Sequence, residues 1–362
     1  MPSQTNELAL EITIEKYLTG ISTEEQRTNA VAEDATAYGG LGYYVGKPND
    51  YNARFAVDEV RFWDFLEKTQ PEELQKLKRE SDWQLKILDR LDKIIKKYGI
   101  LRVLKKGLAI DDAHFTFFYV APLQNSSATV KENFQKNQFS VTRQLRYSVS
   151  NPLEEIDMAL FINGIPISTI ELKNHWTGQN ARVHGINQYK FKRDITQPLL
   201  NFGRCIVHFA IDTDEIYMTT KLDGAKTFFL PFNLGNNFGK GNPANPFGHK
   251  TAYFWQEILK KESIANIIQH FVRFDGGEKE PLSKKTLYFP RYHQLDVVRR
   301  LIKDTSSNGA GKKYLIQHSA GSGKSNSITW LAYQLIEVYP ENTNSAKNKD
   351  SNEPLFDSVI VV

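Results

Sequence analysis

Residues 155–173 of the chain read EIDMALFINGIPISTIELK, and this stretch decides the fold. Two apolar runs, 156–162 and 167–173, are rich in the β-branched and aliphatic residues that strands favour. Between them, Asn163-Gly164 is a strong signal for a tight turn. The stretch therefore predicts a β-hairpin whose two strands are apolar enough to be buried.

Further elements are expected on both sides of this hairpin. Strand-like patterns occupy residues 114–121, 139–147, 204–211, 215–219 and 227–230. Helical spacing of apolar residues predicts helices over 5–18, 55–68, 82–98, 188–193 and 251–274, while 232–249 reads as a long loop. Helices that flank a mixed sheet define an α/β domain.

Three polar residues in the hairpin carry chemistry: Asp157, Glu171 and Lys173. Because side chains alternate along a strand, Glu171 and Lys173 share one face. Two carboxylates and a lysine in this arrangement resemble the PD-(D/E)xK nucleases. Carboxylate oxygens suit Mg²⁺, so Asp157 and Glu171 are the predicted metal ligands. The metal would activate water and polarise the scissile phosphate, and Lys173 would orient that water or stabilise the developing charge.

The register of the hairpin decides whether Asp157 joins the other two residues. A two-residue turn pairs Asp157 with Ile170 and sends the Asp157 side chain to the opposite face. A three-residue turn with Gly164 in the left-handed conformation pairs Asp157 with Thr169 and brings all three to one face. We therefore expect the longer turn. The alternative is an ordinary charge pair at an exposed strand edge, but the apolar neighbours favour burial, and a buried carboxylate needs partners.

The composition narrows the class of protein. A length of 362 residues suggests two or three domains, and a net charge of +4 is compatible with nucleic acid without requiring it. The single cysteine, Cys205, excludes an internal disulfide and reads as a buried thiol. No stretch is apolar enough to span a membrane, and residues 1–4 do not resemble a secretory signal. We expect a cytoplasmic protein.

Near the end of the chain, His318–Ser325 reads HSAGSGKS, between an expected strand (314–317) and an expected helix (325–339). In such a loop Gly321 and Gly323 let backbone N–H groups approach a phosphate, Lys324 reaches the β- and γ-phosphates, and Ser325 ligates Mg²⁺. The motif predicts ATP as a cofactor, although His318 replaces the usual first glycine. A chance turn is the alternative, and the strand before and helix after count against it.

Upstream of this loop, FPRYHQ at 289–294 resembles the adenine-reading Q motif of superfamily 2 helicases and translocases. Gln294 has the amide that can pair with both a donor and an acceptor on adenine. We expect an endonuclease domain over 1–274, a polar linker over 275–285 and the truncated start of a RecA-like motor over 286–362, with a second buried strand at 355–362.

Several motifs together resemble the nuclease domain of the restriction (R, or HsdR) subunit of type I restriction-modification enzymes. They are Arg143–Tyr147, Glu171–Asn174 with Thr177–Gln179, Gly203–Ala210, Asp212 with Tyr217–Thr220, and Phe229–Asn233. The resemblance implies ATP-dependent translocation coupled to Mg²⁺-dependent endonuclease cleavage of unmodified double-stranded DNA. It also implies methyltransferase and specificity subunits as partners, and no membrane.

Some residue roles come from the resemblance alone. Some members of the family carry a Q-x-x-x-Y element on a helix after the lysine, whereas here Tyr189 follows Gln188 directly. We assign Gln188 to the catalytic residues, and Tyr189 is the weaker candidate for this role. Glu11 corresponds either to a helix glutamate near the metal or to an exposed helix charge. His175, His184 and His208 lack the spacing of metal ligands and are expected to be structural or surface residues.

Two other functions stay open. One is a different nuclease-helicase fusion from anti-phage defence or DNA repair, and the other is a non-catalytic subunit that docks on the methyltransferase core. The motifs that resemble the restriction subunit favour that subunit over a different fusion, and a DNA-cleavage assay on the isolated chain would distinguish it from a non-catalytic subunit. Because the acidic box and arginine finger of a motor are missing, we expect no ATPase activity from this chain by itself. A basic cluster over residues 93–106 is a solvated face or a phosphate contact.

Overall fold

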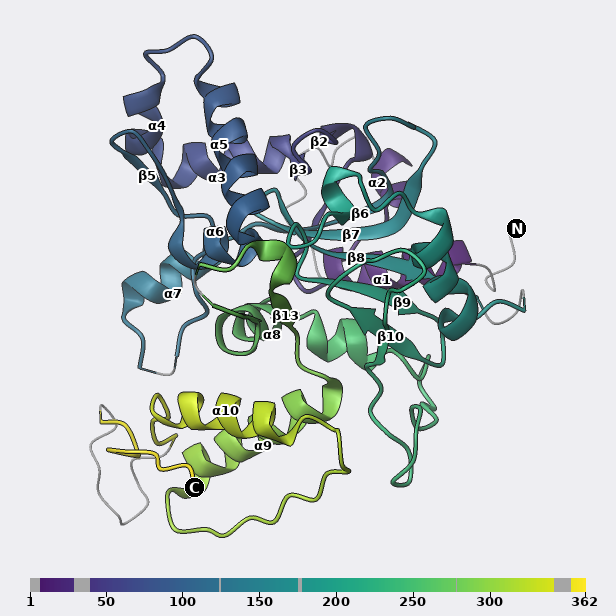
Figure 1. Cartoon of the computed structure of the whole chain (residues 1–362), viewed down its shortest axis with the longest axis vertical. Helices are drawn as coiled ribbons and strands as arrows, with labels where there is room; N and C mark the ends of the chain where they lie inside the picture. Colours follow the sequence, from purple (N-terminus) through teal and green to yellow (C-terminus); the bar gives the residue numbers. More distant parts are fainter. Residues whose placement is uncertain (1–6, 29–39, 124, 175–177, 278, 342–352) are drawn as a thin grey trace.

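The structure is a computed structural model that describes residues 7–28, 40–123, 125–174, 178–277, 279–341 and 353–362. Its centre is a seven-stranded mixed sheet in the order β1-β6-β7-β8-β9-β10-β11 (Figure 1). These strands are β1 (Tyr44–Val45), β6 (Phe139–Arg146), β7 (Glu155–Ile162), β8 (Ile165–Leu172), β9 (Val207–Ile211), β10 (Ile216–Thr219) and β11 (Leu230–Pro231). The β1–β6 and β8–β9 pairs are parallel and the others antiparallel. The expected α/β architecture is confirmed.

Helices surround this sheet. The helices expected near the start of the chain are confirmed with shifted ends, as α1 (Glu7–Thr19), α3 (Glu59–Thr69) and α5 (Trp83–Tyr98). Shorter helices that we did not expect are α2 (Thr23–Thr28), α4 (Pro71–Leu77), α6 (Ile100–Lys106) and α7 (Ala128–Gln135). Within the described ranges, no helix combines the length and apolar character needed to cross a bilayer.

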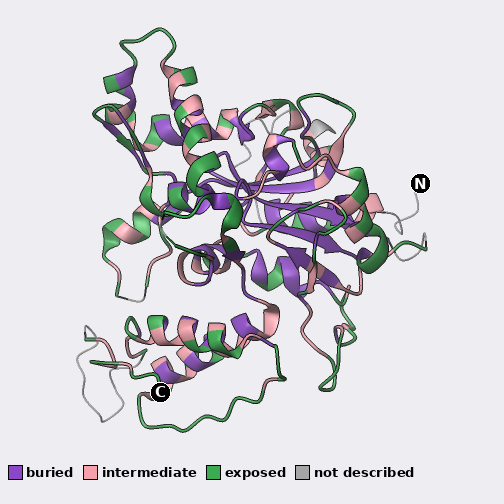
Figure 2. Cartoon of the chain, in the orientation of Figure 1, coloured by how far each residue is buried: buried purple, intermediate pink, exposed green. Residues whose placement is uncertain are grey.

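Apolar side chains on the two faces of the sheet form separate clusters. The neighbouring residues Leu160 and Phe161 belong to different clusters, as alternation along a strand requires. Figure 2 shows the central strands buried along most of their length. Every residue of β8 is buried, so the prediction that Glu171 lies on a buried strand is confirmed. An exposed strand edge is excluded for this residue.

The β7–β8 turn differs from the one we expected. Ile162 pairs with Ile165, so the turn has only the two residues Asn163 and Gly164, with φ angles of 52° and 77°. The register then shifts by one between Phe161 and Leu160, because Ile167 bulges out of β8. The prediction of a three-residue turn is therefore wrong. A two-residue turn followed by a bulge still places Asp157 on the same face as Glu171 and Lys173, because the extra residue in β8 reverses the change of face that the short turn would cause.

The Asn163 side chain connects this turn to other segments of the domain through hydrogen bonds. Its side-chain Oδ1 accepts a hydrogen bond from the Gln138 N–H at 2.6 Å. Its Nδ2 donates to the Phe117 carbonyl at 2.9 Å and to Oδ1 of Asn137 at 3.0 Å. The side chain is fully buried, and asparagine tolerates the left-handed backbone better than most residues.

The segment expected as a strand over 114–121 is only partly one. β5 (Ala113–Phe115) pairs with β4 (Leu108–Ile110), and the residues beyond it pair with no strand in the described structure. Side-chain amides satisfy their backbone instead: Gln70 bonds both the N–H and the carbonyl of Thr116, and Asn137 does the same for Tyr119. The spacing of apolar residues in the sequence cannot show that side-chain amides, and not a neighbouring strand, pair with this backbone.

The remaining elements are short. The predicted helix over 251–274 is broken into η6 (Phe254–Ile258), α8 (Lys261–Asn266) and η7 (Ile267–Phe271). Two small antiparallel ladders join β2 (Tyr51–Asn52) to β3 (Val57–Asp58) and β12 (Arg273–Asp275) to β13 (Thr286–Tyr288). The loop expected over 232–249 is confirmed, since it holds only an isolated bridge. Single helical turns lie at η1 (Pro48–Asp50), η5 (Pro198–Leu200) and η8 (Leu282–Lys284).

The C-terminal part contains α9 (Tyr292–Asn308) and α10 (Lys324–Leu335), and Trp330 of α10 packs on Phe271 with ring centroids 5.5 Å apart. The strands expected at 314–317 and 355–362 are wrong, because neither segment forms a strand. Leu315 and Ile360 are 95% and 83% exposed rather than buried. A strand needs a neighbour to pair its backbone groups, and no described segment lies in register with either one.

The Asn163 contacts lead to a stability prediction. Asn163→Ala removes three buried hydrogen bonds and leaves alanine at a positive φ, so unfolding should become easier by roughly 3 kcal/mol. Asn163→Gly loses the same bonds without the backbone strain, so its free energy of unfolding should lie between those of the original protein and Asn163→Ala. Urea unfolding measures this order, and an alanine variant within about 1 kcal/mol of the original would contradict the role of the turn.

Candidate nuclease site

The bulge brings Asp157, Glu171 and Lys173 together at one end of the β7–β8 hairpin. The ladder ends at the pair Met158–Ile170, so Asp157 comes next opposite Glu171 on the same face. Oδ2 of Asp157 accepts a hydrogen bond from the Leu172 N–H at 2.6 Å. Nζ of Lys173 lies 3.8 Å from the same oxygen. The three side chains thus converge in space, while their catalytic roles stay a prediction.

Lys173 is held firmly in this group. Its Nζ donates to the Leu172 carbonyl at 2.6 Å and to Oε1 of Glu7 at 3.3 Å. The Lys173 residue is only 5% exposed. Its ammonium is therefore fixed between a carbonyl and two carboxylates, which suits a cation that orients a reactant.

Glu171 is completely buried and only half satisfied. Oε1 accepts a hydrogen bond from Nε of Arg193 at 2.6 Å, whereas Oε2 has no partner among the described residues. Burial, followed by repulsion from Asp157, raises the pKa of Glu171 to about 8, against the opposing effect of Arg193. A bound cation would stabilise a buried carboxylate oxygen that has no hydrogen-bond donor.

Helix α1 presents a row of carboxylates to this face through Glu7, Glu11 and Glu15. Glu11 is 5% exposed and accepts a hydrogen bond from Nε of Arg143 at 3.1 Å. Burial and the nearby charge of Asp157 raise the pKa of Glu11 to about 7. Glu11 is therefore a buried neighbour of the site, and the alternative of an exposed helix charge is wrong.

The acidic groups fit a hard cation with few protein ligands. In the described part of the chain, no group of three or more His, Cys, Asp or Glu side chains could hold a metal ion. Two carboxylates remain, Asp157 and Glu171, and Mg²⁺ is the ion that commonly binds through one or two carboxylates and keeps its waters. The unpartnered Oε2 of Glu171 supports this fit.

The helical segment after Lys173 contains Gln188 and Tyr189, whose relative importance the sequence did not establish. Gln188 begins η4 (Gln188–Lys192) and is half-buried. Tyr189 is fully buried, and its hydroxyl lies 2.8 Å from Oγ1 of Thr169, which in turn lies 2.7 Å from Nδ1 of His208. Burial lowers the pKa of His208 to about 3, so this histidine is neutral and structural, as expected.

Arg193 and Arg143 were not predicted as site residues. Each forms ion pairs with a carboxylate of the face although the partners are far apart in the sequence, such as Arg143 with Glu15 at 2.9 Å. The run of basic residues that ends the expected helix was a signal for Arg193, and Arg143 stands first in the Arg143–Tyr147 motif. His175, for which a structural role was expected, lies outside the described residues.

Gln144 is a further neighbour that the motifs did not single out. It stands on β6 between the pairs Arg143–Met158 and Leu145–Ile156, and so beside Asp157 on β7. Its φ is 50°, in the left-handed region, and it is exposed. A non-glycine residue held there without packing to support it is characteristic of functional positions.

The phosphate loop has the local shape that its glycines predicted. Gly321 and Gly323 have φ angles of 70° and 83°, and α10 begins at Lys324. Nζ of Lys324 turns back over the loop, 3.3 Å from the carbonyls of His318 and Ser319. The helix therefore starts directly after the glycine turn, as the motif requires.

Gln294 is engaged by this loop rather than exposed. Its Nε2 donates to the carbonyls of Ser322 and Gly323 at 3.2 and 3.0 Å, and its Oε1 accepts from the Arg291 N–H at 2.9 Å. The residue is 3% exposed. The structure thus places Gln294 behind the phosphate loop, and its contact with adenine stays a prediction.

The basic cluster is divided between structural and solvated roles. Nζ of Lys105 donates to the carbonyls of Gln269 and Val272, both at 3.1 Å, and burial lowers its pKa to about 8. Lys96 pairs with Asp92 at 2.7 Å. These partners are protein groups, so the cluster offers less free charge to phosphates than the sequence suggested.

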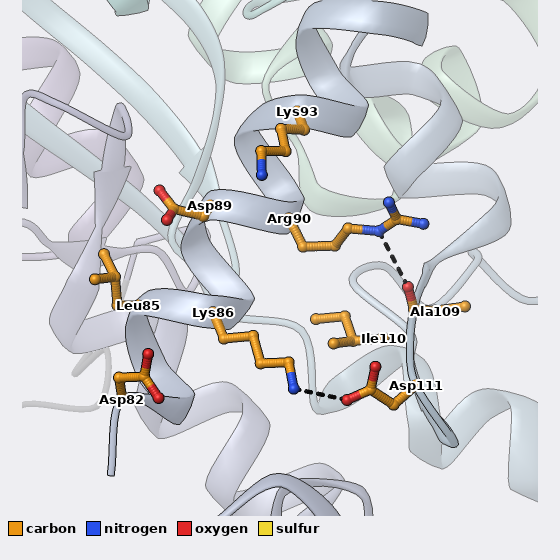
Figure 3. Close-up of a pocket in the computed structure, with 9 residues that line it drawn as sticks. All are labelled: Asp82, Leu85, Lys86, Asp89, Arg90, Lys93, Ala109, Ile110 and Asp111. Atoms are coloured by element: carbon orange, nitrogen blue, oxygen red, sulfur yellow. Dashed lines mark hydrogen bonds and ion pairs between the residues drawn. The ribbon is translucent and has the colours of Figure 1, made fainter. Parts of the chain in front are cut away.

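A cavity of about 500 Å³ lies next to this cluster, between α5 and the β4–β5 hairpin (Figure 3). Lys86 crosses it to reach Asp111 at 2.7 Å, and Nε of Arg90 donates to the Ala109 carbonyl at 3.4 Å. Asp82 and Asp89 line the same space. With basic and acidic residues in balance, the cavity carries no strong preference for an anion.

Comparison with known proteins agrees with this geometry. Residues 41–227 match the family described as "Type I restriction enzyme R protein N terminus". The match contains Asp157, Glu171, Lys173 and Arg193, and α1 lies outside it. An α/β domain with an acidic face at one edge of its sheet is the class of fold found in nucleases. The chain belongs to the type I restriction enzyme R proteins, and the matched region is their N-terminal part.

Individual relatives share the same kind of name. A protein of Methanocaldococcus jannaschii with the provisional name type I restriction enzyme MjaVIIIP endonuclease subunit is 29% identical over 228 residues, which are 60% of this chain and 20% of the relative. The type I restriction enzyme HindI endonuclease subunit of Haemophilus influenzae is 24% identical over 215 residues, which are 59% and 20%. The chain thus spans about a fifth of the length of these relatives.

The crowded carboxylates lead to a prediction about pH. Without divalent ions, protonated Glu171 and Glu11 stabilise the folded state, because their pKa values of about 8 and about 7 exceed the ordinary value of 4.5. Stability should therefore fall as the pH rises from about 4.5 to about 8. Asp157→Asn removes a charge that raises both pKa values, so its curve should be flatter, with on the order of 1 kcal/mol more stability at pH 8.

Urea unfolding in EDTA across this pH range measures the difference. Asp112→Asn, at an exposed carboxylate of the β4–β5 turn, is the matched control and should follow the original protein. Parallel curves for Asp157→Asn and the original protein would show that Asp157 does not interact with the two glutamates.

Proposed function

We propose that this chain carries the endonuclease face of a type I restriction enzyme R subunit and cleaves double-stranded DNA with Mg²⁺. The observation that carries the proposal is the buried Glu171, whose Oε2 has no described partner, beside Asp157 and Lys173. A structural ion pair would satisfy both oxygens of a buried carboxylate, whereas this one is left open toward a negatively charged neighbour.

Each side chain has a distinct task in this proposal. Asp157 and Glu171 hold the cation, and bound Mg²⁺ lowers the pKa of water and polarises the scissile phosphate. Lys173 orients the attacking water and stabilises charge on the phosphate. Arg193 keeps Glu171 close to ionisation and fixes the direction of its carboxylate. Gln188 begins η4, the helical segment that precedes Arg193, and we assign it a contact with the substrate.

The second part of the proposal concerns the C-terminal segment. The positive φ angles of Gly321 and Gly323 and the position of Lys324 support binding of ATP phosphates, with Ser325 as a Mg²⁺ ligand and Gln294 as the adenine contact. We infer a RecA-like motor that couples ATP-dependent translocation to cleavage of unmodified DNA. The methyltransferase and specificity subunits are the partners that such a complex needs.

The nuclease assignment is tested by substitution in the complete enzyme. Asp157→Ala and Lys173→Ala should each lower DNA cleavage by roughly a hundredfold or more, because each removes a group needed to bind the cation or stabilise the transition state. ATP hydrolysis should remain. Lys131→Ala, at an exposed lysine of α7, is the matched control. Cleavage of plasmid at a normal rate by either site variant would reject its role.

The motor assignment is tested at Lys324. Lys324→Ala in the complete enzyme should reduce ATP hydrolysis and translocation by at least about a hundredfold, since the lysine neutralises the transferred phosphate. Cleavage should fail as well if it depends on translocation. Lys303→Ala, on the exposed side of α9, serves as control. Normal cutting of unmodified DNA by the Lys324 variant would contradict the coupling.

A further inference from the structure

The long loop after β11 is anchored at the turn between β9 and β10. Nδ2 of Asn242 donates to the Asp214 carbonyl at 2.8 Å, and Oδ1 of Asn242 accepts from the Leu234 N–H at 2.8 Å. Lys250 closes the loop through an ion pair with Asp214 at 2.6 Å. Figure 1 shows the loop projecting away from the sheet beyond β10.

This anchor lies at the same edge of the sheet as the candidate nuclease site. β9 runs parallel to β8, so the carboxyl ends of both strands meet there. The Lys173 N–H donates to the Ile211 carbonyl at 2.8 Å, directly before Asp212. The Ala181 N–H, from the segment that follows Lys173, donates to Oδ2 of Asp212 at 2.7 Å.

The tip of the loop is a strained two-residue turn that carries an exposed aromatic ring. Asn236 and Gly239 exchange both backbone hydrogen bonds, at 3.1 and 2.7 Å, around Asn237 and Phe238. The φ angles of Asn237 and Phe238 are 47° and 61°. Glycine after asparagine is the preferred pair for such a turn, and phenylalanine is disfavoured. Phe238 is nevertheless fully exposed, so no packing in this chain compensates for the strain.

A second ring is presented in a similar way. Oδ1 of Asn245 accepts a hydrogen bond from the Phe247 N–H at 3.0 Å, and its Nδ2 donates to the His249 carbonyl at 3.0 Å. These bonds build a compact turn around Phe247, which is 96% exposed. The loop thus holds two rings in solvent, Phe238 on a turn closed by backbone hydrogen bonds and Phe247 on a turn that the Asn245 side chain stabilises.

The charge of this segment is one-sided. Residues 224–256 contain no Asp or Glu, whereas Lys240 and Lys250 lie close to the two phenylalanines in the sequence. Asp214 pairs with Lys250 at the base of the loop, but the loop adds no carboxylate of its own, and such a segment tolerates the negative potential close to a nucleic acid backbone. Two separate rings among asparagines and glycines do not form the contiguous apolar patch typical of a protein interface.

We propose that the loop over residues 233–250 binds the DNA duplex next to the cleavage site, with Phe238 and Phe247 stacking on bases. This inference rests on the nuclease function proposed above, because it places DNA at this edge of the sheet. Apolar side chains that enter base steps and rings that stack on bases are established means of holding DNA. The loop would keep the duplex in place beside Asp157, Glu171 and Lys173.

The test is DNA binding by the purified 362-residue chain, without cleavage. Fluorescence anisotropy with a labelled duplex in EDTA gives the affinity of the original chain and of F238A, F238G and F247A. Each variant should bind roughly tenfold more weakly, because each loses one stacking contact. The dependence of binding on salt should stay unchanged, because no phosphate contact is removed.

F238G separates the ring from the turn. It places the preferred residue in the strained position, so the protein should be as stable as before or slightly more stable and yet lose affinity. F228A is the matched control: Phe228 is 74% exposed, and the β10–β11 pairing places it at the opposite end of β10. Its affinity should equal that of the original chain.

Each outcome decides one question. Equal binding by F238G, F247A and F228A overturns the loop proposal and leaves the nuclease assignment standing, and so does an original chain that fails to bind the duplex. Weaker binding by the two loop variants, together with normal cleavage by Asp157→Ala enzyme, keeps the loop and rejects the nuclease residues. Loss of self-association in sedimentation, with unchanged DNA affinity, would make the loop a contact between proteins and overturn the proposal.

Discussion

The arrangement of this domain depends on keeping Asp157 and Glu171 next to each other at the end of a buried hairpin. Burial, and after it repulsion between the two carboxylates, raises the pKa of Glu171 to about 8. Arg193, Lys173 and Arg143 approach from three different elements, and each one pairs with a carboxylate of the face. The charges compensate incompletely, because Oε2 of Glu171 is left without a partner in the described structure.

The position of those carboxylates follows from the backbone of β7 and β8. A two-residue turn by itself would place Asp157 and Glu171 on opposite faces, and the bulge at Ile167 reverses this outcome. The β7–β8 turn depends on Asn163, whose side chain forms hydrogen bonds with three backbone or amide groups from other segments. A structural asparagine therefore sets the register on which the acidic face depends.

The sequence predicted the parts of this arrangement that are local. Apolar alternation and the Asn163-Gly164 pair predicted the hairpin, and the burial of β8 followed from its composition. The bulge at Ile167 has no comparable signal, because one extra residue in a strand leaves the apolar pattern almost unchanged. The pairing of Arg143 with Glu11 joins residues that are 132 positions apart, so it depends on how α1 packs. The wrong strands at 314–317 and 355–362 had apolar sequence but no partner to pair with.

Non-glycine residues with positive φ angles occur in both buried and exposed parts of this domain. Asn163 and Phe238 both adopt positive φ angles, but only Asn163 is buried and repaid by hydrogen bonds from its side chain. Gln144 and Phe238 hold the same kind of conformation while exposed to solvent, where folding gains nothing from it. Gln144 stands beside Asp157, and the Phe238 loop is anchored at the edge where Lys173 lies. Both of these exposed positions belong to segments at the end of the sheet that carries Asp157, Glu171 and Lys173, whereas Asp111 adopts a positive φ in the β4–β5 turn.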